Sequence, residues 1–519
     1  MNLDLKNCCL IFLCLGMFAC TSNRVGTPYG VTDVYIKGIY SLPLTFDPIQ
    51  MNDTASLLVS NLIYDGLLKF APDLSIKGAL AQSWSSSEAG KAYTFVLRPD
   101  AYFHDGSQIT ARAVVKSLSR ALSQNSTVYK YYDCIVGADD FHSGKKSFVS
   151  GLVVKNKNEV VIKLKYPFPP FLSVLAGATA KVLPENLNGH FFDKPIGSGP
   201  FKVTAITKEA GSDRGEIVLT RFDSYAGEKP KVSKMILKAR SEDEAIKEAK
   251  NGKLYDLANY PLSGNEEIFK GGGDVESPLA ATWIIGLNAR LAPFNQLSIR
   301  KAFKASVDSE GFRKTFYPDA IPATGYIPNG MPGHIESKAI SFHKIRAPKT
   351  KQIVIAFPEL LSHEKEMREY LEGSLRQQGW NIKFVPMSWD KLMEGYDKKT
   401  LQGFVLSMNL DYPDTEFLVR NFESNNPDNF SGLSDKKLDQ ILKEARSTED
   451  RFARDRMYKT IIDRIEDLSV TVNLFYPKSH SWVNPCVRGF NSNILADYYI
   501  DYDAVAVDPK CIKDRQGHS

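Results

Sequence analysis

Two strand–helix–strand units, far apart in the chain, most restrict what this sequence can fold into. In the first unit, residues 234–240 alternate apolar and polar side chains as a half-buried strand does. Ser241 followed by Glu244 is the pattern of a capping box, which predicts a helix beginning there. Gly252 ends that helix, and residues 254–258 are predicted as the next strand.

The second unit repeats this order more than a hundred residues later. Residues 352–357 and 382–385 are predicted strands, and Gly379 lies just past the end of the helix between them. That helix carries apolar side chains at helical spacing, namely Met367, Tyr370, Leu371 and Leu375. A further strand is predicted at residues 403–408. Two such units predict two α/β lobes.

The first twenty residues carry an export signal. Residues 8–18 are apolar for about eleven residues, which suits a signal peptide and is too short to span a bilayer. Ala19 before Cys20 resembles a bacterial lipobox, although Met17 stands where a Leu is expected. We predict a signal peptide at residues 1–19, lipid on Cys20 and a flexible tether over 20–29. An ordinary signal peptide cut near Ala19, or an uncleaved anchor, is the alternative.

The seven cysteines divide into two groups. Three leave with the signal peptide and Cys20 carries lipid, so Cys134, Cys486 and Cys511 remain in the folded body. None of them forms a Cys-x-x-Cys pair, so no zinc site is predicted. Export permits a disulfide, and Cys486 and Cys511 could pair, but a free thiol is equally compatible with the sequence.

Composition and motifs argue against several functions. Lys and Arg number 65 against 60 Asp and Glu, and the small excess is scattered, so no nucleic-acid partner is predicted. His363-Glu364 lacks the second histidine of a metalloprotease helix, and Gly271–Gly273 is followed by Asp274 rather than by the Lys of a phosphate-binding loop. No Gly-x-Ser-x-Gly motif occurs. We therefore predict no enzyme activity, cofactor or metal.

Eight short segments, in order and at characteristic spacing, match one known family. They are Thr45–Pro48, Ile63–Leu68, Leu80–Trp84, Tyr93–Arg98 with Phe103–Gly106, Ile196–Phe201, Gly286–Asn288 with Pro293–Phe294, Ile299–Ala302 with Val307–Asp308, and Asp411–Asp414 with Phe417–Leu418. Nearly all of the mature chain resembles the extracellular solute-binding proteins of peptide ABC importers, the oligopeptide- and dipeptide-binding proteins of bacterial family 5.

Several of these motif residues also have a purely structural explanation. His104-Asp105-Gly106 fits a tight turn, in which Gly supplies a positive φ and Asp a local hydrogen bond. Arg300 and Asp308 are expected to make a buried or capping contact, and Trp84 is expected in a core.

The resemblance implies an α/β, two-lobe periplasmic-binding-protein-like fold with an inserted extra domain and a hinge. Domain I would combine residues 30–68, 194–285 and 479–519, domain II would be an insertion at 69–193, and domain III would span 286–478. Chain crossings near Gly286 and Ser481 would form the hinge, where two strands absorb the change in backbone angles on closure.

The resemblance also implies where a peptide binds. Two segments of the family grip the peptide main chain, and they correspond here to Met51, Asn52, Asp53 and Thr54 and to Met408, Asn409, Leu410 and Asp411. Asp411 would pair with the peptide's α-ammonium group. Met408 stands where the family often has Trp, which leaves the shape of the first side-chain pocket open. Alternatively, Asp411 only caps the turn at residues 413–415.

The implied function is capture of oligopeptides between the lobes and delivery to a membrane permease driven by separate ATPase subunits. The protein would be a monomer, lipid-anchored in the cell envelope and facing the periplasm or the exterior. A same-family receptor for murein peptide, nickel, haem or another small solute is one alternative. A secreted lipoprotein hydrolase is the alternative from another class.

Overall fold

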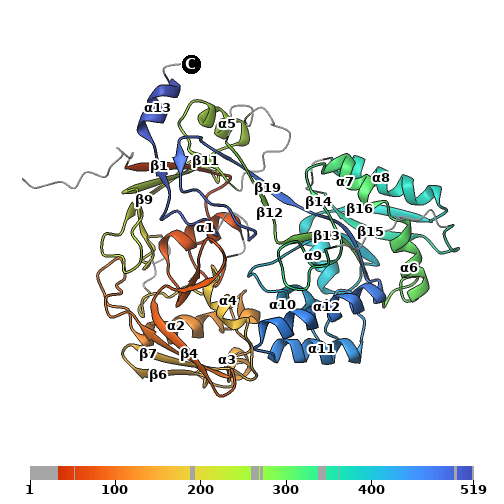
Figure 1. Cartoon of the computed structure of the whole chain (residues 1–519), viewed down its shortest axis with the longest axis horizontal. Helices are drawn as coiled ribbons and strands as arrows, with labels where there is room; N and C mark the ends of the chain where they lie inside the picture. Colours follow the sequence, from red (N-terminus) through yellow and green to blue (C-terminus); the bar gives the residue numbers. More distant parts are fainter. Residues whose placement is uncertain are drawn as a thin grey trace, which may run out of the picture.

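The computed structural model describes residues 33–51, 53–187, 193–258, 268, 273–336, 346–359, 361, 363–495 and 499–516. The predicted signal peptide, Cys20 and the tether lie outside these residues, as does Asn52. The fold is mixed α/β, as expected, and is built around three larger sheets (Figure 1). Within the described part of the chain, no helix combines the length and apolarity needed to cross a bilayer.

A seven-stranded sheet contains the first predicted unit. Its order is β12 (Asp274–Pro278), β19 (Lys478–Val483), β11 (Asp256–Leu257), β1 (Val34–Ile39), β10 (Lys234–Ala239), β9 (Gly215–Arg221) and β8 (Phe201–Lys208). β1 runs parallel to β10 and β11, and β9 runs antiparallel to β10. The predicted strand at residues 254–258 is shorter than expected, because only Asp256–Leu257 form ladder pairs.

A six-stranded sheet contains the second unit. Its order is β14 (Ile321–Pro322), β18 (Thr471–Tyr476), β13 (Ala281–Leu287), β17 (Gly403–Asn409), β15 (Ile353–Pro358) and β16 (Ile382–Met387). Its α/β part is parallel, since β15 pairs with both β16 and β17 in that sense. Helix α8 (Glu364–Gln377) packs its predicted apolar face, including buried Met367, Leu371 and Leu375, against this sheet.

A four-stranded antiparallel sheet lies in the segment between β3 and β8. Its order is β4 (Ala81–Ser87), β5 (Ala92–Leu97), β7 (Glu159–Lys163) and β6 (Leu152–Asn156). The elements around it are the ribbon β2 (Leu68–Phe70) and β3 (Ile76–Gly78), and helices α2 (Ala111–Ala121), α3 (Ala138–His142) and α4 (Phe171–Ala176).

The remaining helices flank the two large sheets. They are α1 (Thr54–Ile63), α5 (Glu242–Lys250), α6 (Leu297–Ser306), α7 (Ser309–Phe316), α9 (Trp389–Asp397), α10 (Glu416–Val419), α11 (Lys436–Ser447), α12 (Arg451–Leu468) and α13 (Pro509–Gln516). The capping box predicted for α5 is confirmed: the Glu244 N–H donates to the Ser241 hydroxyl, and the Ser241 N–H donates to the Glu244 carboxylate at 3.0 Å.

Two connections join the large sheets. β12 leads into β13 and β18 leads into β19, and β12 pairs with β19 as an antiparallel ribbon that runs between the two bodies (Figure 1). β13 (Ala281–Leu287) spans the expected boundary at residues 285/286 and lies wholly in the six-stranded sheet. The division into three domains stays a prediction, and the sheets place the crossing a few residues earlier than residue 286.

Several local expectations are confirmed by the structure. Gly106 has a φ of 84°, and the Asp105 carboxylate accepts a hydrogen bond from the Ser107 N–H at 2.9 Å, as the predicted turn requires. Asp308 caps α7 through the Gly311 N–H.

The structure also settles the positions of Arg300 and of the cysteines in the folded body. Arg300 is buried and donates to the main-chain oxygens of Phe294 and Leu468. Cys486 and Cys511 form a disulfide, which decides between the alternatives that the sequence left open, and Cys134 is a free buried thiol.

Candidate ligand-binding cavity

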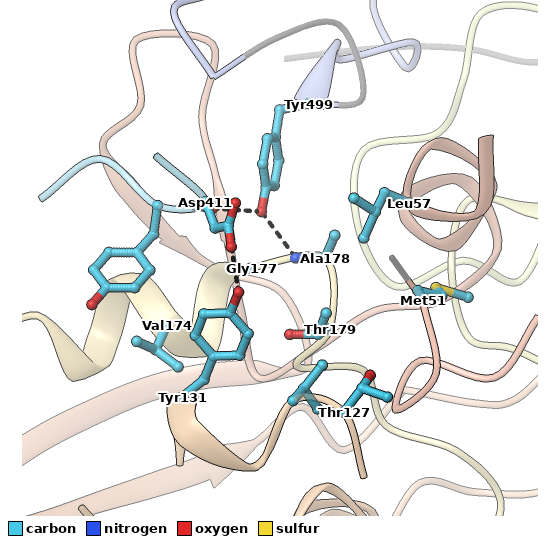
Figure 2. A pocket seen from close by; sticks show the side chains of 12 residues that line it. Met51, Leu57, Thr127, Tyr131, Val174, Gly177, Ala178, Thr179, Asp411 and Tyr499 are labelled. Atoms are coloured by element: carbon cyan, nitrogen blue, oxygen red, sulfur yellow. Dashed lines mark hydrogen bonds between the residues drawn. The ribbon is translucent and has the colours of Figure 1, made fainter. Parts of the chain in front are cut away.

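A cavity of about 290 Å³, open to solvent, lies where five separate stretches of chain converge (Figure 2). One wall is the segment around the start of α1, and another is the segment that leads through the 3₁₀ turn Tyr129–Tyr131. The end of α4 and the loop after it, the chain beyond β17 and the C-terminal segment complete it. The lining residues are Met51, Leu57, Thr127, Val128, Tyr131, Val174, Gly177, Ala178, Thr179, Asp411, Tyr412 and Tyr499.

Asp411 is held at the cavity edge by the residues on either side of it. It lies two residues beyond the end of β17, and the preceding Leu410 is buried, with its N–H donating to the Ala280 carbonyl at 2.9 Å. The following Tyr412 is also buried. These two anchored neighbours fix the main chain, so the Asp411 side chain is presented between them.

A different carboxylate caps the turn that follows. Asp414 accepts hydrogen bonds from the Glu416 N–H at 2.9 Å and from the Tyr458 hydroxyl at 2.8 Å, and it faces Arg454 at 3.5 Å. The Asp411 carboxylate instead accepts a hydrogen bond from the Tyr131 hydroxyl. The capping role that was the alternative for Asp411 is therefore taken by Asp414.

Two tyrosines connect Asp411 to the opposite walls. The Tyr499 hydroxyl donates to the main-chain oxygen of Asp411 at 3.3 Å and accepts from the Ala178 N–H at 3.0 Å (Figure 2). Tyr131 approaches from the other side, and its ring stacks on that of Phe417 with 6.3 Å between centroids. Tyr131 therefore positions the Asp411 carboxylate, and Tyr499 positions its main-chain oxygen.

The surroundings shift the pKa of Asp411 upward. Although the Asp411 side chain is exposed to the open cavity, the protein around it displaces bulk water, and this desolvation is the largest cause and raises the pKa, whereas the hydrogen bond from Tyr131 and the positive charge of Arg420 lower it. Burial and the negative charge of Asp411 also raise the pKa of Tyr131, so this phenol stays protonated and remains a donor. An incoming cation would stabilise the ionised form of Asp411.

Asp411 is the one charged side chain among the described residues that line the cavity. Among the described residues, Lys130, Arg420 and Lys181 are cations on neighbouring stretches of chain that do not line it. Lys130 forms an ion pair with Asp428 at 2.7 Å, and the Arg420 guanidinium stacks on the Phe417 ring at 4.9 Å. A cavity with one carboxylate and otherwise neutral walls suits a ligand with a single positive group and uncharged neighbouring parts.

Few of the described residues in the lining belong to the types that usually serve in catalysis or metal binding. Of the side chains that surround the cavity in the described structure, none is His, Cys or Lys, and the hydroxyls there belong to Thr and Tyr. A possible metal-ligating group, Asp274, Glu276 and His480, lies on the ribbon of β12 and β19 instead, and Glu276 is already paired with Lys478 at 2.9 Å.

The predicted site residues fall into two sets. Asp411 and Met51 line the cavity together, although 360 positions separate them in the chain. Asp53 instead caps α1 by accepting from the Ser56 N–H at 2.9 Å, and Thr54 begins that helix. Asn52 lies outside the described residues.

The predicted site residues Met408, Asn409 and Leu410, which precede Asp411, are not among the residues that line the cavity. Met408 packs on a hydrophobic core, Leu410 is buried in that core, and the Asn409 amide oxygen accepts from the Ser407 hydroxyl. Along one edge β17 pairs with β13 as far as Asn409, but along the other edge its ladder with β15 covers only Gly403 and Phe404.

The predicted site residues did not include Tyr131, Tyr499 or the segment from Val174 to Thr179. No local pattern marks them, since an aromatic residue in a turn and small residues after a helix are common features. Their role in the cavity follows from contacts across 280 and 88 positions to Asp411.

Comparisons with known proteins identify the family to which the chain belongs. Residues 75–430, more than half of the chain, match the model of the family described as bacterial extracellular solute-binding proteins, family 5 Middle. The probable D,D-dipeptide-binding periplasmic protein DdpA of Escherichia coli (strain K12) is 24% identical over 507 residues, which cover 91% of this chain and 94% of that protein. The dipeptide-binding protein DppE of Bacillus subtilis (strain 168) is 25% identical over 489 residues, or 85% of this chain and 88% of that one.

A solved structure shares the whole fold. The murein tripeptide binding protein MppA of Escherichia coli aligns with a TM-score of 0.74 at 16% identity, covering 93% of this chain and 99% of that chain. At this identity the likeness concerns the fold alone.

Proposed function

The chain belongs to family 5 of the bacterial extracellular solute-binding proteins, which bind solutes and are not enzymes, and from this premise we propose that it captures peptides by their free amino terminus. The observation that supports this most is the lining of the cavity, where Asp411 is the one charged side chain among the described residues. A peptide's α-ammonium group needs an opposite charge when it leaves water. Asp411, fixed by Leu410 and Tyr412 and hydrogen-bonded to Tyr131, supplies that charge.

The edge of β17 supports main-chain recognition. Beyond Phe404 its ladder with β15 ends, so the strand approaches Asp411 with one edge outside that pairing. An extended peptide can add to such an edge through main-chain hydrogen bonds, which carry affinity without depending on side-chain identity. This is the role that we propose for Met408, Asn409 and Leu410, while Met51 forms part of the opposite wall.

The test uses one peptide with and without a free amino group. In Asp411→Ala, a desolvated α-ammonium loses its partner, which costs about 2–5 kcal/mol, or roughly 30- to several-thousand-fold in affinity. The wild type should bind a tripeptide far better than its N-acetylated form, and Asp411→Ala should bind both equally weakly in calorimetry.

Asp414→Asn is the matched control. It removes a carboxylate three residues away that contacts Arg454 and Tyr458 instead of the cavity. This variant should lose thermal stability yet keep the wild-type preference for the free amine. An Asp411→Ala protein that still discriminates like the wild type would refute the proposed site.

Delivery to a permease with separate ATPase subunits completes the proposed function. We propose that the mature protein is a monomer held at the cell envelope, facing the periplasm or the exterior, by lipid on Cys20. The pattern of residues 15–20 supports the lipid. Labelled fatty acid should enter the wild type and not Cys20→Ala, and equal label in both would refute the anchor.

A murein peptide remains a second candidate within the same proposal. MppA, which shares the fold, is by its name a murein tripeptide binding protein, and a murein peptide with a free amine would use the same carboxylate. Mass spectrometry of the ligand that co-purifies with the native protein separates the two. A nickel or haem ligand finds less support, because no His or Cys lines the cavity among the described residues.

A further inference from the structure

We propose that Lys130 and Asp428 form a latch outside the peptide cavity, which strengthens the binding of different peptides by the same factor because it holds the two bodies of the molecule together. One body contains the seven- and four-stranded sheets, and the other contains the six-stranded sheet. The Lys130 ammonium donates to the Asp428 carboxylate at 2.7 Å, across 298 positions in the chain. The inference rests on the proposed function and adds two residues that determine affinity without touching the ligand.

The two residues of the latch belong to different bodies. Lys130 lies between α2 and α3, in the segment that carries the four-stranded sheet, whereas Asp428 lies between β17 and β18 of the six-stranded sheet. In the described structure, the chain passes between the bodies only where β12 leads into β13 and β18 leads into β19 (Figure 1). The chain therefore does not enforce the contact, and the contact is lost whenever the bodies separate.

One short turn makes two different contacts with the body of the six-stranded sheet. Lys130 and Tyr131 are neighbours in the 3₁₀ turn Tyr129–Tyr131. The Tyr131 hydroxyl contacts Asp411 inside the cavity, whereas the Lys130 ammonium contacts Asp428. Neither Lys130 nor Asp428 is among the residues that line the cavity. The turn thus separates recognition of the ligand from the contact that keeps the bodies together.

Both partners are held in place by their own bodies. The Tyr129 ring stacks on that of His142 with 3.8 Å between centroids, which anchors the turn. On the other side, the Asp428 N–H donates to the Asn426 side-chain oxygen at 2.8 Å. Because the main chain is already ordered on both sides, forming the pair costs mainly the side-chain freedom of Lys130.

The exposure of the pair sets the size of its effect. The Lys130 side chain is 52% exposed and that of Asp428 is 31% exposed. An exposed pair contributes modestly, which corresponds to about two- to fivefold in peptide affinity. Lys399 and Arg420 also attract Asp428, but they belong to its own body, so their attraction does not depend on closure. A contact made only while the bodies touch favours the state that retains the peptide.

A double-mutant cycle on the mature protein tests the latch. Lys130→Met and Asp428→Asn should each weaken binding about two- to fivefold in calorimetry, and the double variant should bind no more weakly than either single variant. Lys130→Arg keeps the charge and should bind like the wild type. Ala-Ala-Ala and Ala-Phe-Ala should lose the same factor, because the pair does not touch the peptide. The difference from the wild type should shrink in about 1 M NaCl, which screens an exposed pair.

Lys155 and Glu159 provide the matched control. Their pair also measures 2.7 Å and is partly exposed, but it lies within the four-stranded sheet. Lys155→Met, Glu159→Gln and the double variant should leave peptide affinity unchanged. Independent, additive losses in the cycle of Lys130 and Asp428, or a loss for one tripeptide and not for the other, would overturn the latch while leaving the proposed function intact. A wild-type protein that binds neither tripeptide would overturn both.

Discussion

The ion pair between Lys37 and Asp256 is the interaction whose loss we expect to be most damaging to the seven-stranded sheet. Both side chains are completely buried and lie opposite each other on the paired strands β1 and β11. The Lys37 ammonium also donates to the Ala258 carbonyl at 3.2 Å. Asp256 additionally accepts from the Tyr35 hydroxyl at 2.7 Å and from the Ala258 N–H at 3.1 Å.

The magnitude follows from what each substitution leaves behind. Lys37→Met removes the cation and leaves the Asp256 carboxylate buried with neutral donors only, which should lower the unfolding free energy by about 3–5 kcal/mol. Lys37→Met with Asp256→Leu removes both charges. That double variant leaves the Tyr35 hydroxyl without this acceptor, at about 1–3 kcal/mol, so it should be more stable than the single variant.

Equilibrium unfolding in urea, followed by circular dichroism, measures the difference. Lys155→Met is the control, because Lys155 forms an exposed pair with Glu159 and such pairs contribute about 0–1 kcal/mol. If Lys37→Met costs no more than Lys155→Met, or if the double variant is as unstable as the single one, the account of the buried pair is refuted.

Three further predictions concern other parts of the molecule. Burial lowers the pKa of His104 to about 4, and the neutral ring makes hydrogen bonds to the main chain of Gly197 and Gly199. Because the pKa in the unfolded chain is about 6.5, the neutral ring stabilises the fold fully above pH 6.5, and up to about 3 kcal/mol of unfolding free energy should be lost as the pH falls to 4. His104→Gln should remove this dependence when melting is measured against pH. The Cys486–Cys511 disulfide closes a loop with a separation of 25 residues, so Cys486→Ala with Cys511→Ala should cost about 3.5 kcal/mol, and an unchanged melting temperature would contradict this. Because the pKa of Asp411 is raised, acidification should weaken peptide binding at a higher pH than it would with an ordinary Asp. Tyr131→Phe removes a hydrogen bond that lowers this pKa, so it should move the loss of affinity to still higher pH. Calorimetry between pH 4 and 8 measures both effects.

Features that depend on neighbouring residues could be predicted from the sequence. The capping box of Ser241 and Glu244 and the turn at Gly106 involve residues two or three positions apart, so their chemistry is visible in the sequence. The apolar spacing of α8 likewise identified its buried face. Met51 and Asp411 were instead predicted as site residues from the resemblance to a known family, because local patterns hold no information on contacts between distant segments.

The tertiary structure alone decided how these parts work together. Lys37 lies in an ordinary strand pattern, which does not predict that this lysine is buried. It is buried because the pairing of β1 with β11 places Asp256 opposite it. Tyr131 and Tyr499 contact Asp411 across 280 and 88 positions in the chain. The tertiary structure likewise shows that Cys486 and Cys511 form a disulfide, where the sequence had left a free thiol open. Helix and strand periods are set by contacts within a few residues, so the sequence by itself determined those elements and the α/β class. The cavity depends on the relative positions of three sheets. Those positions are set by side-chain packing between segments that are far apart in the sequence, so local sequence patterns do not predict them.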